Sequence, residues 1–170
     1  TGRTGRALIH SLLRAKRLPR TVTVPVSAGL LTDIDAYFAS LTAYREGNPT
    51  TIIELIAEAS FRAVDNGRTL ASDLSAIRDG WNERITVRRD AAAHRLADLL
   101  VRQPVVDSPL VQRELGVAAT NANTAIDHLA EQGILTKVSG NYRNRKWAAP
   151  EVLAALDEFA ERAGRRTRSS

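Results

Sequence analysis

Cysteine and methionine are both absent from the 170-residue sequence. Their absence excludes disulfides, thiolate metal sites, cysteine nucleophiles and thioether ligands, so any chemistry must use Ser, Thr, His, acidic residues or Arg. No apolar run approaches the roughly 20 residues that a membrane-spanning helix needs, and no basic-then-apolar signal segment opens the chain. We therefore expect a soluble cytoplasmic protein with no membrane partner.

Lysine is also scarce, because Lys16, Lys137 and Lys146 are the only lysines among 24 basic residues. With 19 acidic residues the formal charge is +5, and hydrophobic residues make up 44% of the chain, which is enough for a core. The sequence starts at Thr1 and contains no Met, so we expect a fragment or a processed product.

Proline and glycine are sparse, and apolar residues recur at helical spacing, so the sequence predicts a mostly α fold. One helix is expected over residues 3–16, and a second begins at a Thr32 or Asp33 cap and ends at Gly47-Asn48-Pro49. The inner face of the second helix is predicted to consist of five apolar or aromatic residues: Ile34, Tyr37, Phe38, Leu41 and Tyr44.

A long helical stretch follows from Thr50, either as one helix or as two helices joined by a kink near Asn66-Gly67. Its apolar residues form a nearly heptad seam, which comprises Leu70, Leu74, Ile77, Trp81 and Ile85. Packing of this seam within the chain is the favoured interpretation, and a homodimeric coil is the alternative.

The second half of the sequence predicts shorter helices and strands, which are separated by residues typical of turns. Ser108 is predicted to cap a short helix that has Pro109 at its first position, Gly116 supplies a turn, and Gly133 closes the next helix. The expected elements are a helix over 90–102, a short 105–106 segment, helices over 108–115 and 119–132, strands over 134–138 and 142–148, and a helix over 151–162. This order is that of a winged helix-turn-helix domain with a small β-hairpin wing. The predicted domains are therefore residues 1–88, a helical part, and residues 89–170, the winged helix with a C-terminal helix.

In a helix-turn-helix domain the third helix presents its first turns to the major groove. The exposed candidates for contact with DNA or a partner are Thr120, Asn121, Asn123 and Thr124. This helix has no Lys or Arg and carries Asp127 and Glu131, so positive charge for phosphates would have to come from Arg113, Lys137, Arg143, Arg145 and Lys146. The scarcity of positive charge on the helix favours docking on protein over contact with DNA, and both interpretations stay open.

The three histidines are expected to be surface or half-buried helix residues. They are His10, His94 and His128, and no pair has the spacing of metal ligands, so we expect no metal site.

The first six residues open directly into the first predicted helix. A glycine-bearing turn at a helix N-terminus offers backbone N–H groups and the positive end of the helix dipole, and Arg3 and Arg6 occupy neighbouring helical positions. Such an arrangement suits a polyphosphate.

Several segments resemble the C-terminal part of a Fic (Fido) domain, and the resemblance implies that residues 1–88 are the C-terminal helices of a truncated Fic helical bundle. These segments are Gly2-Arg3-Thr4-Gly5-Arg6-Ala7-Leu8, Pro19-Arg20, Val24-Pro25-Val26-Ser27, Tyr37-Phe38, Leu41 and Tyr44-Arg45-Glu46-Gly47-Asn48. Residues 90–150 in turn resemble the winged helix that many bacterial Fic proteins append. The family motif is His-Pro-Phe-x-acid-Gly-Asn-Gly-Arg-x-x-Arg, and its members usually transfer AMP from ATP, with Mg²⁺, to a hydroxyl group of a target protein.

The resemblance implies a role for each matching residue. Gly2 matches the second motif glycine, Arg3 the arginine that grips the nucleotide phosphates, and Arg6 the closing arginine, while Thr1 stands at the motif Asn. The motif His and metal-binding acid have no counterpart here, so we expect no AMP transfer by these 170 residues alone and no catalytic residue among them. The intact parent is expected to be an adenylyltransferase that uses ATP and Mg²⁺.

Two interpretations from other classes remain. A standalone winged-helix transcription regulator would use the helical first half for dimerisation. A protein-interaction module would use the same fold without DNA.

Overall fold

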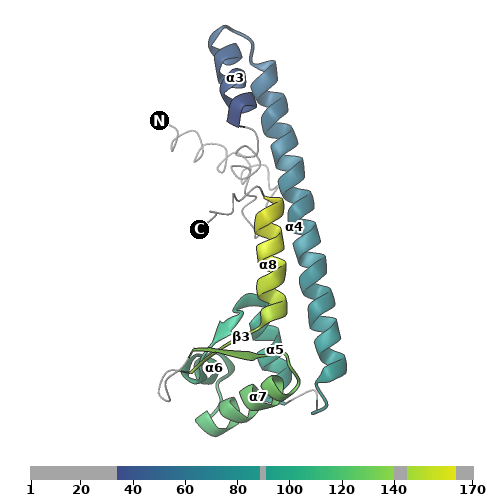
Figure 1. Cartoon of the computed structure of the whole chain (residues 1–170), viewed down its shortest axis with the longest axis vertical. Helices are drawn as coiled ribbons and strands as arrows, with labels where there is room; N and C mark the ends of the chain where they lie inside the picture. Colours follow the sequence, from purple (N-terminus) through teal and green to yellow (C-terminus); the bar gives the residue numbers. More distant parts are fainter. Residues whose placement is uncertain (1–33, 89–90, 140–144, 164–170) are drawn as a thin grey trace. The chain divides into compact units, whose positions relative to one another are not determined.

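The computed structural model describes residues 34–88, 91–139 and 145–163. Within these ranges the chain is mostly helical and contains a small three-stranded antiparallel sheet (Figure 1). The helices are α3 (Ile34–Arg45), α4 (Thr50–Arg84), α5 (Ala92–Arg102), α6 (Ser108–Leu115), α7 (Ala119–Glu131) and α8 (Pro150–Arg162), and the strands are β1 (Val105–Val106), β2 (Thr136–Ser139) and β3 (Lys146–Ala148). The helix expected over 3–16 and the cap at Thr32 or Asp33 lie outside the described residues.

The chain divides into two compact units. Unit 1 comprises Thr1–Arg68 and Glu161–Ser170, and unit 2 comprises Thr69–Ala160. The last part of α4 therefore belongs to unit 2, together with the helices and strands that follow it. The domain division at residue 88 rests on sequence pattern and remains a prediction.

In unit 1, the turn after α3 follows the predicted chemistry. Gly47 has a φ of 93°, a left-handed conformation that glycine adopts without strain, and the Asn48 N–H donates to Ala43 O at 2.9 Å. The Asn48 Oδ1 accepts from the Thr50 N–H at 3.1 Å. The predicted helix end is thus confirmed, and the same turn satisfies a free N–H group at the start of α4.

The predicted inner face of α3 is wrong for three of its five residues. Ile34, Phe38 and Tyr44 are 47%, 60% and 58% exposed, while the other two are half-buried. Among the described residues of unit 1, the buried ones are small, namely Ser40 on α3 and Ala59 and Ala63 on α4. Periodicity identifies an apolar stripe, but it does not show whether another element covers that stripe.

Helix α4 is a single helix of 35 residues with no break at Asn66-Gly67. The C-terminal part of its apolar seam packs inside unit 2: Trp81 and Ile85 are buried, and Leu74 and Ile77 pack against the same core. Packing within the chain is therefore confirmed for these four residues.

The core of unit 2 lies between its helices and the small sheet. Five of its helices and strands contribute fully buried side chains, which include Leu96 and Leu100 (α5), Val106 (β1), Val111 (α6), Ile126 and Leu129 (α7), and Val152 (α8). Each helix of unit 2 packs one face against this core, so its opposite face is available to solvent or to a partner.

The sheet has the strand order β1-β3-β2. Val105 pairs with Ala148 on one side of β3, and Lys137 pairs with Trp147 on the other. Strand β2 starts two residues later than predicted because the N–H groups of Ile134 and Leu135 bond to Leu129 O, at 2.9 and 3.1 Å, and so close α7. The central part of the hairpin, residues 140–144, lies outside the described residues.

The cap of α6 corrects a detail of the sequence interpretation. Asp107, not Ser108, is the N-cap residue: its backbone is extended and its Oδ1 accepts from the Leu110 N–H at 2.8 Å. Ser108 is the first helical residue. The predicted helix ends are confirmed, because Gly116 and Gly133 have φ values of 64° and 69°.

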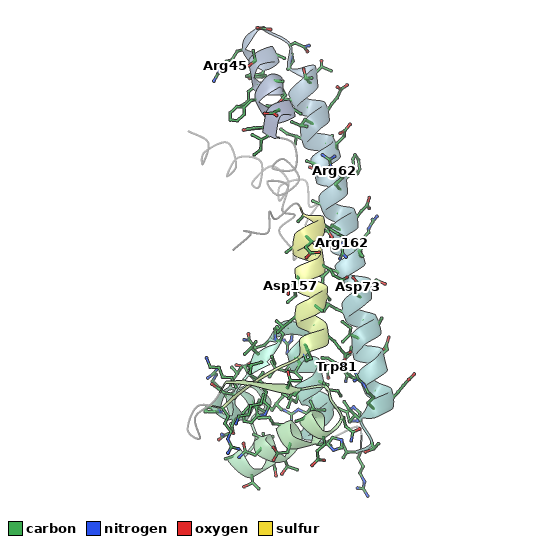
Figure 2. The ribbon with its side chains drawn as sticks, viewed as in Figure 1. Arg45, Arg62, Asp73, Trp81, Asp157 and Arg162 are labelled. Atoms are coloured by element: carbon green, nitrogen blue, oxygen red, sulfur yellow. The ribbon has the colours of Figure 1, made fainter. Side chains whose placement is uncertain are left out.

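Polar contacts join the end of α4 to α8 and α5 within unit 2. Trp81, labelled in Figure 2, donates its Nε1–H to Glu151 Oε2 at 3.2 Å, and Arg84 Nη2 donates to Glu151 Oε1 at 2.6 Å. On the neighbouring turn, Arg78 Nε donates to Asp98 Oδ1 at 2.7 Å. These contacts fix the helices that support α6, α7 and the sheet.

Candidate functional site

Helix α7 is held by one apolar face. Ala122, Ala125, Ile126 and Leu129 are buried, at the three- and four-residue spacing of a helix stripe. No side chain caps the helix, because its N-cap residue is Ala118. The burial of this stripe decides which α7 side chains face outward.

The outward side of the first two turns is polar and uncharged. Thr120, Asn121, Asn123 and Thr124 are all exposed, as the sequence predicted, and we call these four residues the α7 face. The Thr124 hydroxyl donates to Thr120 O at 3.0 Å. No large apolar side chain of α7 is exposed. The α7 face therefore presents amide and hydroxyl groups, which both donate and accept hydrogen bonds.

Basic residues lie on the elements next to α7. Arg113 is in the last turn of α6, which packs against α7, and its Nε bonds to Glu114 Oε1 at 3.3 Å. That side chain is 68% exposed, so the pair is an exposed one and contributes little to stability. Lys137 and Lys146 are exposed on the neighbouring strands β2 and β3 and form no ion pair within the described ranges.

The two remaining basic candidates of the hairpin are Arg143 and Arg145. Arg145, just before β3, is half-buried. Arg143 lies outside the described residues, and so do the three predicted phosphate-binding residues Gly2, Arg3 and Arg6.

Two carboxylates occupy the later turns of α7. Asp127 and Glu131 are exposed, and neither forms an ion pair with a described residue. With no Lys or Arg on α7, positive charge in this region comes from the neighbouring elements. The assignment of these cations to phosphate contact remains a prediction.

Two histidines differ in their surroundings. His128 on α7 is half-buried, as expected. His94 is buried, contrary to the expectation, and its Nε2 lies 3.1 Å from Val87 O. Among the residues that the structure describes, no group of three or more His, Cys, Asp or Glu side chains could hold a metal ion.

One surface residue near the site was missed in the sequence. Val138 on β2 is 54% exposed, beside Lys137. The alternation of apolar residues could not locate it because Ile134 and Leu135 are both buried and break the period of two.

Comparison with known proteins yields no family model that matches the chain. The curated proteins likewise contain no significant match. Over the described residues, none of the helices combines the length and the apolar character needed to cross a bilayer.

Proposed function

We propose that unit 2 is a winged helix-turn-helix domain that binds duplex DNA, with α7 in the major groove and the β2–β3 hairpin against the phosphate backbone. The element order supports this proposal: α5, β1, α6 and α7 are followed by the hairpin. The helix-turn-helix motif consists of α6 and α7, and the second helix of such a motif, which is the third helix of the domain, enters the major groove.

The observation that carries the proposal is the composition of the α7 face. Amide and hydroxyl groups read base edges, and asparagine pairs with adenine through two hydrogen bonds. A protein interface would instead be expected to have aromatic or other large apolar anchors at its centre, and no such side chain is exposed on α7. We give the lack of such an anchor more weight than the scarcity of positive charge on α7, which by itself favours protein, and take nucleic acid as the ligand of this face.

Phosphate contacts are assigned to the neighbouring elements. Lys137 and Lys146 have exposed ammonium groups on adjacent strands, and Arg113 lies on the helix that packs against α7. Such contacts set the position of a protein on the duplex, and base contacts then provide specificity.

The proposal is tested by fluorescence anisotropy with a duplex library, over a series of salt concentrations. DNA binding through three phosphate-contacting cations predicts that log affinity falls against log salt with a slope of about −2.7, at about −0.9 for each neutralised phosphate. Absence of duplex binding, or affinity that does not respond to salt, would refute the proposal.

We infer a second function from the sequence resemblance: a longer protein, in which an upstream His-Pro-Phe segment and acidic residue complete the Fic motif that ends in this chain, transfers AMP from ATP to a target protein in the cytoplasm. The match of Gly2, Arg3 and Arg6 to the motif supports this inference. Because these residues lie outside the described ranges, the test is genetic and biochemical.

The upstream coding sequence is read first, and the longer protein is then assayed for AMP labelling. A His-Pro-Phe segment upstream and loss of labelling in R3A are the expected results. A gene without that segment would refute the inference and would favour a standalone transcription regulator.

A further inference from the structure

Asp127 lies on the same side of helix α7 as three of the four residues of the α7 face. At 100° per residue, Thr120, Asn123, Thr124 and Asp127 fall within an arc of about 100° on the helix. All four side chains are exposed. Over the seven residue steps from Thr120 to Asp127 the helix rises about 10 Å, which is about the length of three base-pair steps of DNA.

The Asp127 carboxylate is available for a ligand. It makes no hydrogen bond or ion pair with another described side chain. A carboxylate held near phosphates is repelled unless a donor faces it, so in the proposed complex Asp127 is tolerated best opposite a base that presents a donor.

The bases differ in what they offer to a carboxylate in the major groove. Cytosine presents an N4 amino donor, whereas guanine presents the N7 and O6 acceptors and thymine the O4 acceptor. Adenine presents an N6 donor with the N7 acceptor beside it. A carboxylate is therefore attracted by cytosine and opposed, wholly or in part, by the other three bases.

We propose that Asp127 is a specificity-determining residue that selects a cytosine in the DNA site, while Asn123, one turn earlier, selects an adenine. This inference rests on the proposed DNA binding by α7. Asparagine offers the donor and the acceptor that match adenine N7 and N6. The two residues are four apart, which is about 6 Å along the helix, so the selected bases lie about two base-pair steps from each other.

Selection from a library of duplexes with a randomised core tests the inference on the full chain. The selected duplexes are expected to contain the cytosine and the adenine at this spacing. D127N converts the acceptor into a group that pairs with adenine, so the preference at that one position is expected to change from cytosine to adenine. The discrimination at that position is expected to be about 5- to 150-fold.

Glu131 provides a matched control. It is the last residue of α7, one turn beyond Asp127 and farthest from the first turns that are proposed to enter the groove, and it is also exposed without an ion pair among the described residues. E131Q removes the same charge, so it is expected to raise affinity for all duplexes alike and to leave every base preference unchanged.

The outcomes separate the inference from the function on which it rests. Selected duplexes without a preferred cytosine, or a D127N protein with unchanged base preference, would overturn the role of Asp127 while DNA binding stands. A chain that selects no duplex would refute the proposed function as well. Circular dichroism of D127N checks that the substitution at this exposed position leaves the helices intact.

Discussion

Replacement of Trp81 by alanine is expected to destabilise unit 2 strongly. The side chain is fully buried in the core, where Ile85, Leu74 and Ile77 also lie, and its Nε1–H donates to Glu151. A buried tryptophan removes roughly 200 Å² from water, which at about 25 cal/mol per Å² corresponds to about 5 kcal/mol. Because alanine retains part of this burial and the site relaxes around the cavity, the expected loss is about 3–5 kcal/mol.

Urea unfolding followed by far-ultraviolet circular dichroism measures this loss, because the substitution removes a fluorophore. The matched control is F61A: Phe61 lies on the same helix but is 72% exposed, so its replacement is expected to change stability by no more than about 0.5 kcal/mol. W81F keeps an aromatic ring and loses the N–H donor, for an expected cost of about 1–2 kcal/mol. A loss below about 1 kcal/mol in W81A would show that α4 does not contribute to the core of unit 2.

Three further substitutions test local features of unit 2. D107A removes the N-cap of α6 and is expected to cost about 1 kcal/mol in the same unfolding assay, whereas a neutral result would mean that water caps the helix equally well. G116A places a Cβ at a left-handed φ of 64° and should lower the free energy of unfolding by about 1 kcal/mol. G80A introduces a Cβ at a helical position with open space around it and should raise the free energy of unfolding by about 0.5–1 kcal/mol. Equal effects of the two glycine substitutions would contradict the left-handed assignment. K146Q removes one of the proposed phosphate contacts and is expected to reduce the magnitude of the salt slope for DNA binding by about 0.9, and an unchanged slope would place Lys146 away from the duplex.

The helices and turns of unit 2 follow from local sequence. Gly116 and Gly133 end helices because both adopt positive φ values that other residues resist. The N-cap was assigned one residue too late since Asp107 and Ser108 both favour this position. Only the backbone geometry, with Asp107 extended, decides between two such neighbours.

The features that depend on distant residues could not be predicted. Trp81 and Glu151 are 70 residues apart and form a hydrogen bond, but nothing near either residue indicates the other. Similarly, Val105-Val106 is recognisable as a short extended segment, while its pairing with β3 depends on tertiary packing. On α3, the stripe of Ile34 and Phe38 is correct as a pattern and wrong as a core, since burial depends on what lies opposite.

The candidate site could be predicted largely because α7 has a clear apolar stripe. Once Ala122, Ala125, Ile126 and Leu129 face the core, Thr120, Asn121, Asn123 and Thr124 must face outward. The hairpin was harder to predict because β2 and β3 are short, and their ends depend on how α7 closes.

The strand order leaves β2 at the rim of the sheet, with one row of backbone groups unpaired by any described strand. Such rows attract the strands of other chains and promote aggregation. Here the row is four residues long, carries Lys137, and is interrupted by an irregularity between Lys137 and Ser139. Short length, a charged side chain and a break in register all oppose the addition of another strand. The edge strand β2 can therefore remain exposed to solvent while the protein resists self-association through this rim.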